Sequence, residues 1–426
     1  MTMNRRAFLS TSSAAGAWIA GVARGYGQSA SPNAKLNIGL IGVSGMRGRD
    51  HLAQCASQTI AAICDVDEAH LGVVAQQHPK AARYADFREM LEKEKGLDAV
   101  LVTTPDHVHA PAAMMAMKLG KHVYVEKPLA HSVYEARVLR ETAAARKVAT
   151  QMGTQIHSGS NYRRVVELVR AGAIGKVREV HTFLGGHRWS ADALPAASDC
   201  PPTLNWDLWL GPAADRPFSK GYHPAGGWRK YWNFGGGDLA DMACHHVDLP
   251  FWALGLKSPV TVEAKGPPPN PDGAPPWAEV TWTFADPAVT LTWYHGDRLP
   301  AALKEIGWEK KWRGGNLFVG EKGYLLANYG DHKLLPEEKY ADFAPPTPSI
   351  PESPGHHAEW FEACRGGAPA LCNFDYAGAL TECVLLGNVA YRSGRKIEWD
   401  AAAMKAKNCP EADAFLRREY RKGWTL

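Results

Sequence analysis

Residues 122–129, H-V-Y-V-E-K-P-L, decide how the first part of this chain folds. The run His122–Val125 has the length and apolar character of a short buried strand, and it leads directly into Glu126, Lys127 and Pro128. Because a proline disfavours helical geometry in the residue before it, Lys127 is held extended where the strand leaves its sheet. Ligands of open parallel sheets bind beyond the carboxyl ends of the strands. The stretch therefore predicts a lysine at a ligand site, and the alternative is an ordinary surface lysine before a turn.

Comparable apolar runs recur along the first part of the chain, with amphipathic stretches between them. The apolar runs fall at residues 36–42, 60–65, 99–103 and 148–152. The amphipathic stretches fall at residues 87–95, 110–119 and 133–146. Alternation of short strands with helices of this length predicts an α/β fold with a doubly wound parallel sheet.

The turn after the first apolar run is an imperfect dinucleotide fingerprint. The pattern G-x-G-x-x-G would place glycines at positions 44 and 47, whereas the glycines of this chain fall at 42, 45 and 48. Small residues still allow backbone amides at a helix start to approach a pyrophosphate. The turn residues predicted to contact the cofactor are Gly42, Ser44, Gly45, Met46 and Arg47.

Asp65 ends the second apolar run, about twenty residues after the turn, as in dinucleotide-binding domains. A carboxylate there accepts hydrogen bonds from the adenosine ribose hydroxyls and repels a 2′-phosphate. The cofactor prediction is therefore NAD, with NADP less favoured. The alternative is that Asp65 caps the following helix.

Residues 103–109, T-T-P-D-H-V-H, follow the fourth strand and reach the same sheet edge as Lys127. They are predicted to line the nicotinamide ribose, although the two histidines could equally be polar groups of a loop and a helix start. The remaining residues predicted to contact cofactor are Thr104, Pro105, His107, His109, Glu126, Lys127 and Gln155.

Residues 235–248, G-G-G-D-L-A-D-M-A-C-H-H-V-D, form a second cluster with chemical potential. They indicate a glycine-rich loop entering a helix that continues to about residue 255. Asp241, His245 and Asp248 fall at i, i+4 and i+7, on one face of this helix. A carboxylate four residues from an imidazole can orient it as a proton acceptor. A metal site and a structural ion pair are the alternatives, and we predict no metal.

These motifs together resemble the Gfo/Idh/MocA oxidoreductases, the family of glucose–fructose oxidoreductase and inositol dehydrogenase. The resemblance lies in I-G-L-I-G-V-S-G, T-P-D-H-V-H-A, V-E-K-P and the glycine-rich helix, and it extends over nearly the whole chain after the N-terminal segment. Its most specific parts are Glu126-Lys127-Pro128 and Asp241 with His245. The resemblance implies a Rossmann domain, then an α/β domain with an open, mostly antiparallel sheet often used for oligomerisation. It also implies that a cis bond often precedes Pro128.

The second half of the chain fits a sheet with one covered face followed by helices. Strand-like alternation occurs at residues 260–265, 279–284, 289–294, 317–319 and 324–329, and helices are predicted at 356–365 and 376–391. A further helix at 163–171 is placed by the resemblance at the domain junction. The predicted division is a signal segment at 1–30, a Rossmann domain at 31–155 and a substrate and oligomerisation domain at 156–426.

Tryptophans concentrate within the substrate domain, at positions 189, 206, 209, 228, 232 and 252. Aromatic faces suit the C–H faces of sugar rings, and neighbouring polar groups can bind hydroxyls, whereas a core or loop role is at least as common for any one tryptophan. The residues predicted to contact substrate are Lys127, Tyr162, Arg163, Trp206, Arg229, Asp241 and His245.

The N-terminal segment carries N-R-R-A-F-L-S at residues 4–10, then a mildly apolar run at 14–23. It resembles a twin-arginine export signal, and the alternative is an arginine pair in a disordered tail. The run is too short to span a bilayer as a stable helix, so no integral membrane span is expected in the mature protein. The twin-arginine signal predicts a periplasmic or otherwise exported location. Arg5, Arg6 and Arg24 supply most of the net charge of +4, which leaves no support for nucleic-acid binding.

The eight cysteines show neither a C-x-x-C pair nor metal-ligand spacing. Cys64 and Cys244 lie in apolar runs and are predicted to be buried thiols. Twin-arginine substrates generally fold before export in a reducing compartment, so we expect no essential disulfide.

The functional hypothesis is hydride transfer between a hydroxyl carbon of a sugar, cyclitol or glycoside and a tightly held nicotinamide cofactor. In it His245, set by Asp241, accepts the hydroxyl proton, and Lys127 stabilises charge on the same oxygen. One alternative is a redox-neutral NAD-dependent glycoside hydrolase that works through a 3-keto intermediate. A second is an inactive exported sugar-binding protein on the same scaffold. A homodimer or homotetramer is expected from the resemblance.

Overall fold

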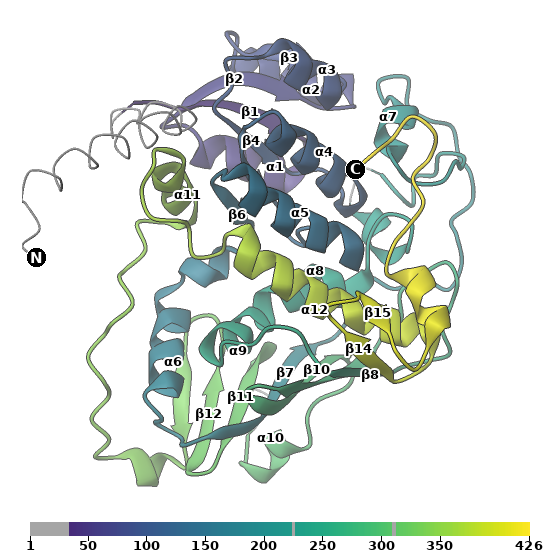
Figure 1. Cartoon of the computed structure of the whole chain (residues 1–426). Helices are drawn as coiled ribbons and strands as arrows, with labels where there is room; N and C mark the ends of the chain where they lie inside the picture. The colour runs from purple at the N-terminus through teal and green to yellow at the C-terminus, as the bar shows by residue number, and fades with distance from the viewer. Residues whose placement is uncertain (1–33, 224–225, 309–311) are drawn as a thin grey trace, which may run out of the picture.

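The computed structural model describes residues 34–223, 226–308 and 312–426. Two sheets lie one above the other in Figure 1, and the long helix α12 (Phe374–Ser393) runs between them. The predicted export signal at residues 1–30 lies outside the described residues. Within those residues, no helix is both long enough and apolar enough to cross a membrane.

The upper sheet is wholly parallel, with the strand order β3-β2-β1-β4-β5-β6. Its strands are β1 (Asn37–Ile41), β2 (Thr59–Cys64), β3 (Ala82–Tyr84), β4 (Ala99–Val102), β5 (His122–Val125) and β6 (Thr150–Met152). β1 and β4 are buried almost throughout, because helices cover both faces of the sheet. The five predicted strands are confirmed, and only the three-residue β3 was not predicted.

Helices follow the strands on both faces of this sheet. They are α1 (Gly45–Gln54), α2 (Glu68–Gln77), α3 (Phe87–Lys93), α4 (Asp106–Lys118) and α5 (Val133–Arg146). Polar side chains start them: Asp67 accepts from the Ala69 amide at α2, and Ser132 and Glu135 form a capping box at α5. Asp67, and not Asp65, is therefore the cap of α2.

The lower sheet has nine strands in the order β13-β12-β11-β7-β10-β9-β8-β14-β15. Its strands are β7 (Val177–Gly185), β8 (Thr261–Lys265), β9 (Ala278–Ala285), β10 (Ala288–Gly296), β11 (Gly314–Gly320), β12 (Gly323–Ala327), β13 (His332–Leu335), β14 (Ile397–Asp400) and β15 (Lys405–Ala406). The pair β7–β10 is parallel and the others are antiparallel, which confirms the expected open, mostly antiparallel sheet. The strand β7, which lies between β11 and β10, was not predicted.

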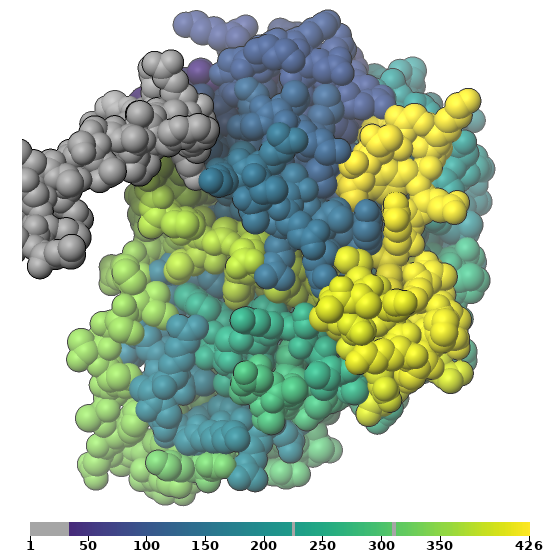
Figure 2. Space-filling model, viewed as in Figure 1, coloured from purple at the N-terminus to yellow at the C-terminus, as the bar shows by residue number. Residues whose placement is uncertain are grey.

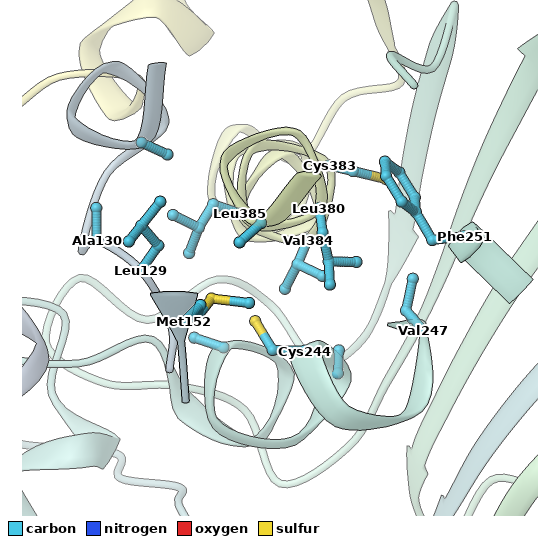
Figure 3. Packing of buried hydrophobic residues seen from close by; sticks show 14 of the residues in the cluster. Leu129, Ala130, Met152, Cys244, Val247, Phe251, Leu380, Cys383, Val384 and Leu385 are labelled. Atoms are coloured by element: carbon cyan, nitrogen blue, oxygen red, sulfur yellow. The ribbon is translucent and has the colours of Figure 1, made fainter. Parts of the chain in front are cut away.

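The core of the molecule joins the two domains through α12. Figure 3 shows Leu380 and Val384 of α12 packing near Met152 of β6 and Cys244, all of which are fully buried. On the sheet below, Trp282 and Trp293 are equally buried, and the indole of Trp282 donates to the Cys383 carbonyl at 2.8 Å. The underside of the Rossmann layer is thus completed by a helix from the other end of the chain.

Two further C-terminal segments also pack on the Rossmann domain. Trp360 of α11 (His356–Cys364) lies edge-on to Tyr124 of β5, with ring centroids 5.5 Å apart. The final residues, yellow in Figure 2, lie against the blue Rossmann helices, and the Tyr134 amide donates to the Leu416 carbonyl. The helices of residues 45–146 therefore do not cover the parallel sheet completely, and C-terminal segments supply the rest of its cover.

The predicted long helix at residues 237–255 is broken in two. It forms α8 (Gly237–His246) and α9 (Asp248–Ala253), which meet at Val247. Pro250 has no amide hydrogen to donate to the His246 carbonyl, so the helix cannot continue unbroken, whereas a proline is tolerated in the first turn of α9. Asp248 consequently leaves the face predicted for it and binds His157, at 2.9 Å.

The remaining elements are short helices and one longer helix that lie between or after the strands already described. They are η1 (Gln155–Ser158), α6 (Ser160–Arg170), α7 (Trp206–Leu210), η2 (Gly227–Lys230), α10 (Ala302–Glu305), η3 (Glu337–Tyr340) and η4 (Pro410–Phe415). All eight cysteines lie in the described ranges as free thiols, and Cys64 and Cys244 are buried as predicted.

A candidate active site between the two domains

A cavity of about 810 Å³ lies beyond the carboxyl ends of the Rossmann strands. Its first wall is built from the turns after β1, β2, β4 and β5, and its second from the segment between β7 and α8 together with α8 itself. The volume is within the range of sites that hold drug-sized ligands and cofactors. Among the predicted residues, the cavity is lined by Gly42, Ser44, Gly45, Met46, Arg47, Asp65, Thr104, Pro105, His109, Glu126, Lys127, Gln155, Arg229, Asp241 and His245.

The glycine turn has the features needed to hold a dinucleotide, in spite of its shifted spacing. Gly42 has φ +83°, a conformation that side chains rarely adopt, and a Cβ on Gly48 would meet the Val43 carbonyl carbon at 2.4 Å. Gly42 therefore makes the tight turn and Gly48 lets α1 pack closely on the end of β1. Asp65 Oδ2 accepts from the Val43 and Ser44 amides, each at 2.9 Å, and so fixes the turn. These features fit a nucleotide pyrophosphate at the start of α1.

Glu126 is the centre of a buried hydrogen-bond network beside this turn. Its Oε1 accepts from Arg47 at 2.7 Å and Gln155 at 2.9 Å, and the His51 ring nitrogen lies 2.8 Å away. Burial alone would raise the pKa of Glu126, but the His51 hydrogen bond and the Arg47 charge hold it well below its usual range. The ionised carboxylate thus ties α1 to the end of β5, where Lys127 follows.

Lys127 extends from the first domain and contacts α8 of the second. The Lys127–Pro128 peptide bond is cis, as the resemblance implied. The Lys127 ammonium donates to the carboxylate of Asp241 and, at 2.8 Å, to the Asp241 carbonyl oxygen. Asp241 also accepts from the Arg229 guanidinium at 3.2 Å and from the Trp189 indole at 2.7 Å. Although burial opposes it, the charges of Lys127 and Arg229 hold the pKa of Asp241 far below its usual range.

His245 lines the same cavity one helical turn after Asp241. Asp241 does not orient His245 by a hydrogen bond as predicted, because its carboxylate accepts from Lys127, Arg229 and Trp189 and holds the lysine instead. Its charge still acts on the His245 ring. Burial and the nearby Lys127 charge lower the pKa of His245 to about 3, so the ring is a neutral base at physiological pH. Its backbone carbonyl accepts from the Tyr162 hydroxyl at 3.1 Å, which braces the helix from behind.

Asp106 is a further residue of the site that sequence reasoning missed. It begins α4, lines the cavity and is 4% exposed. Burial raises the pKa of Asp106 to about 7, against the opposing charges of Arg229 and Lys127. A carboxyl group that exchanges its proton near neutral pH is suited to general acid–base chemistry. The available signal was its position directly after a predicted strand, within the quoted T-T-P-D-H-V-H.

Four predicted contact residues lie outside the cavity wall, and these predictions are corrected. His107 is buried in α4, with its ring nitrogen 2.9 Å from the Trp209 carbonyl oxygen. Tyr162 is fully buried behind α8, and Arg163 is bound to Glu359 at 2.6 Å. Trp206 donates to a backbone carbonyl and stacks on Trp209. In each case the side chain is bound to a local partner and lies away from the cavity wall.

Of the six tryptophans, three line the cavity and three do not. Those on the wall are Trp189, Trp209 and Trp228. The guanidinium of Arg229 lies 4.2 Å from the ring centre of Trp228 and 5.4 Å from that of Trp189. The stacked cation and its two rings form one rigid polar and aromatic surface beside Asp241.

Two family models cover most of the described chain. Residues 36–154 match an oxidoreductase family model described as an NAD-binding Rossmann fold, and residues 159–305 match the C-terminal alpha/beta domain of the same family. The chain belongs to the Gfo/Idh/MocA oxidoreductase family. The first wall of the cavity therefore belongs to an NAD-binding Rossmann domain, as the resemblance implied.

Curated relatives of this Gfo/Idh/MocA protein share part of its length. A glycosyl hydrolase family 109 protein from Shewanella sp. (strain ANA-3) is 29% identical over 211 residues, which cover 46% of this chain and 40% of the relative. An alpha-N-acetylgalactosaminidase from Shewanella oneidensis is 35% identical over 154 residues, 33% of each chain. The matched region thus spans less than half the length of these curated relatives.

Solved structures of the same fold cover most of the chain. The WlbA dehydrogenase from Bordetella pertussis, in complex with NADH and UDP-GlcNAcA, has a TM-score of 0.63 and 17% identity, over 86% of this chain and 99% of that one. The aldose–aldose oxidoreductase from Caulobacter crescentus, complexed with glycerol, has a TM-score of 0.56 and 18% identity, over 86% and 100%. At this identity the likeness confirms the fold alone.

Proposed function

We propose that this protein is an NAD-dependent oxidoreductase that acts on a secondary alcohol of a sugar, cyclitol or glycoside. One observation carries the proposal: Lys127 from the first domain and His245 from the second line a single cavity with the dinucleotide-binding turn. An ammonium and a neutral imidazole beside a nucleotide site are the groups that an alcohol dehydrogenase reaction requires.

The chain's own residues are suited to hold the cofactor. The turn at residues 42–48 and the start of α1 would receive the pyrophosphate, and Asp65 would lie at the adenosine ribose. Thr104, Pro105 and His109 form the wall nearest Lys127 on the neighbouring strand end. When bound, NAD supplies a hydride acceptor for the substrate carbon.

Lys127 and His245 divide the work on the substrate oxygen. The His245 ring is the proposed acceptor of the hydroxyl proton, and it is uncharged in the free protein because burial and the Lys127 charge lower its pKa to about 3. The Lys127 ammonium stabilises the negative charge that develops on the same oxygen. Asp241 positions Lys127, and Arg229 and Trp189 restrain Asp241 in turn.

The substrate class follows from the second wall. Trp189 and Trp228 present aromatic faces, and Arg229 lies between them with its guanidinium directed to Asp241. Aromatic faces with a few fixed polar groups suit a polyhydroxylated ring. The relatives named as glycosidases, and the dehydrogenase neighbour crystallised with UDP-GlcNAcA, support a carbohydrate substrate.

A product analysis tests the proposal. Purified protein is incubated with a panel of free sugars, cyclitols and glycosides, and the masses of the products are measured by mass spectrometry. Loss of two hydrogens from a panel member supports the oxidoreductase. If no panel member changes, and the denatured protein releases no nucleotide absorbance, the inactive sugar-binding alternative replaces the proposal.

A second candidate is redox-neutral glycoside hydrolysis, and Asp106 is the observation that favours it. A transient ketone acidifies the neighbouring hydrogen, so that the leaving group can be eliminated, and a carboxyl group with a pKa of about 7 suits protonation of that leaving group. The relatives named as glycosidases support the same scheme.

The Asp106→Asn variant separates these two functions. For a hydrolase, we expect glycoside cleavage to fall at least about 100-fold while ketone formation from the free sugar persists, since only the leaving-group proton is lost. For a dehydrogenase, both protein forms oxidise the sugar and neither cleaves a glycoside. If glycoside cleavage is unaffected by the variant, Asp106 has no part in the mechanism.

We further propose export through the twin-arginine route and assembly as a homodimer or homotetramer. The export proposal is supported by the arginine pair at positions 5 and 6. The outer face of the lower sheet supports assembly, since Thr281, Thr283, Thr290 and Tyr294 remain partly exposed on it. Fractionation of cells tests export, and a cytoplasmic pool of the mature chain contradicts it. Light scattering of the purified protein tests assembly, and a monomer contradicts it.

A further inference from the structure

We propose that Asp67, His70 and His223 form a binding site for a divalent transition-metal ion of the Zn²⁺ class at the rim of the cavity. Asp67 and His70 belong to the turn and first part of α2, and His223 belongs to the segment between β7 and α8. The ion would thus join the Rossmann domain to the second domain. The sequence spacing predicted no metal site, since His223 lies more than 150 residues after His70.

The local geometry points both histidines at one carboxylate oxygen. Asp67 Oδ1 accepts from the Ala69 amide as the cap of α2, and Thr203 also donates to this carboxylate. His70 Nδ1 lies 3.3 Å from Oδ2 and His223 Nε2 lies 3.6 Å from it. Both ring nitrogens are buried without a hydrogen-bond partner. Buried nitrogens of this kind are costly unless something binds them.

A metal ion satisfies all three atoms at once, whereas hydrogen bonds do not. Ligands at 2.0–2.1 Å from a tetrahedral ion lie about 3.3 Å from one another. The three donor atoms here lie within 4.8 Å of one another, and two of the three separations are 3.3 and 3.6 Å. The His223 separation is already too long for a hydrogen bond. Two imidazoles and one carboxylate are ligands that Zn²⁺ accepts, with a fourth position left for water.

The surroundings strengthen the attraction for a cation. The Asp65 carboxylate is 6% exposed and accepts from the Asp67 amide at 3.0 Å, which brings a second negative group beside the cluster. Asp67 is itself 6% exposed. Because water screens these two carboxylates only weakly, their negative charges attract a divalent cation more strongly than exposed carboxylates would.

The position suggests what the ion would hold in place. The segment that carries His223 is already attached to this turn, because Glu68 donates its amide to Thr203 and Asn205 donates to Val66, each at 2.9 Å. His223 and Asp65 both line the cavity. A bound ion would therefore secure the wall that lies over the predicted adenosine side of the cofactor site.

Metal titration of the full chain tests the proposal. Tag-free protein is stripped with EDTA, and binding of Zn²⁺ is measured by calorimetry, with metal content by mass spectrometry. We expect one ion per chain, and an affinity at least about 100-fold weaker in His70→Ala and His223→Ala. His78→Ala, at the end of the same helix, is the matched control and should bind as the wild type does. No high-affinity ion in the wild type, or equal affinity in all four proteins, overturns the proposal.

A second variant guards against loss of the fold. Asp67→Asn keeps a side chain that caps α2, yet removes the charge at Oδ2. We expect Zn²⁺ to raise the melting temperature of the wild type and the His78→Ala protein, and to leave that of Asp67→Asn unchanged. All variants carry Cys200→Ser, which removes an exposed thiol that could bind Zn²⁺ nearby. An equal rise in Asp67→Asn contradicts the assignment of this carboxylate.

Discussion

Two restraints that are far apart in the sequence hold the Lys127 ammonium in the cavity. The backbone before the cis proline sets where the side chain leaves the first domain, and Asp241 on α8 receives its charge. The pair is nearly buried, with side-chain exposures of 11% and 9%. Removing one member of such a pair leaves the other charge unpaired, but Arg229 and Trp189 still contact Asp241.

Lys127→Met tests the role of this ammonium. The charge that stabilises the substrate oxygen is lost, so we expect kcat to fall about 10²- to 10⁴-fold. NAD affinity, measured by quenching of tryptophan fluorescence, should change little because the glycine turn is untouched. Lys80→Met, an exposed lysine after α2, is the control and should keep full activity. A Lys127→Met rate within about threefold of the wild type would falsify the assignment.

The helix α1 depends on glycine at its start. Its first turn crosses the end of β1 so closely that a Cβ on Gly48 would lie 2.4 Å from the Val43 carbonyl carbon. The glycines at 42, 45 and 48 therefore perform the tasks of the expected fingerprint at shifted positions. The backbone path, and not the letter pattern, decides which positions must be glycine.

Gly48→Ala should push α1 away from β1. We expect a loss of about 1–3 kcal/mol in the free energy of unfolding, since the clash is with backbone, and weaker NAD binding. The control is Gly72→Ala inside α2, where nothing lies within 4 Å of the new Cβ and which should stabilise the protein by about 0.4–1 kcal/mol. Urea unfolding of both variants measures the difference. Equal stabilities would contradict the close approach.

Across the whole molecule, the C-terminal segment completes the Rossmann domain. Arg418 donates to Glu135 at 2.9 Å and contacts the His107 carbonyl, and Tyr420 donates to the same carboxylate at 2.6 Å. Glu135 is 1% exposed and also closes the capping box of α5. The end of the chain therefore neutralises a buried charge of the first domain.

Arg418→Met should lower the free energy of unfolding by about 3–5 kcal/mol, because it leaves the Glu135 carboxylate buried without its cation. Arg417→Met is the neighbouring control: Arg417 is exposed, its guanidinium lies over the Tyr134 ring, and its loss should cost about 1 kcal/mol or less. Urea denaturation at neutral pH compares the two. A smaller effect at Arg418 than at Arg417 would show that the C-terminal segment does not support α5.

Stability of the whole protein should fall as the pH falls from about 6.5 to 4. Burial lowers the pKa of His246 and His356 to about 4 and that of His357 to about 3, from an ordinary 6.5. The unfolded chain therefore binds more protons in this range, and each histidine contributes about 1.4 kcal/mol per pH unit. Asp106 has the opposite sign, since its raised pKa favours the folded state at low pH.

The net slope expected from these four groups is about 2–3 kcal/mol per pH unit between pH 6 and 5. Free energies of unfolding from urea curves at pH 7, 6 and 5 give this slope. Equal free energies of unfolding over that range would contradict the prediction, because the folded and unfolded chains would then bind the same number of protons.

Much of the fold and part of the site could be predicted from the sequence. Buried parallel strands leave continuous apolar runs, so β1, β2, β4, β5 and β6 were recognisable, and the capping box left a clear start for α5. The inner strand β7 escaped prediction because buried and exposed residues do not alternate regularly along it. Lys127 and His245 were identified by their motifs, whereas Asp106 has an ordinary helix-start context.

The sequence by itself determined the family, the NAD-binding domain and many of the side chains proposed to carry chemistry, because local backbone geometry and residue type leave a readable pattern. Only the tertiary structure decided how those side chains are paired. Asp241 holds Lys127 and not His245, Tyr162 braces α8 from behind, and His223 meets Asp67 across the cavity rim. Such pairings depend on which surfaces the packing of two domains brings together, and that information is not local in the chain.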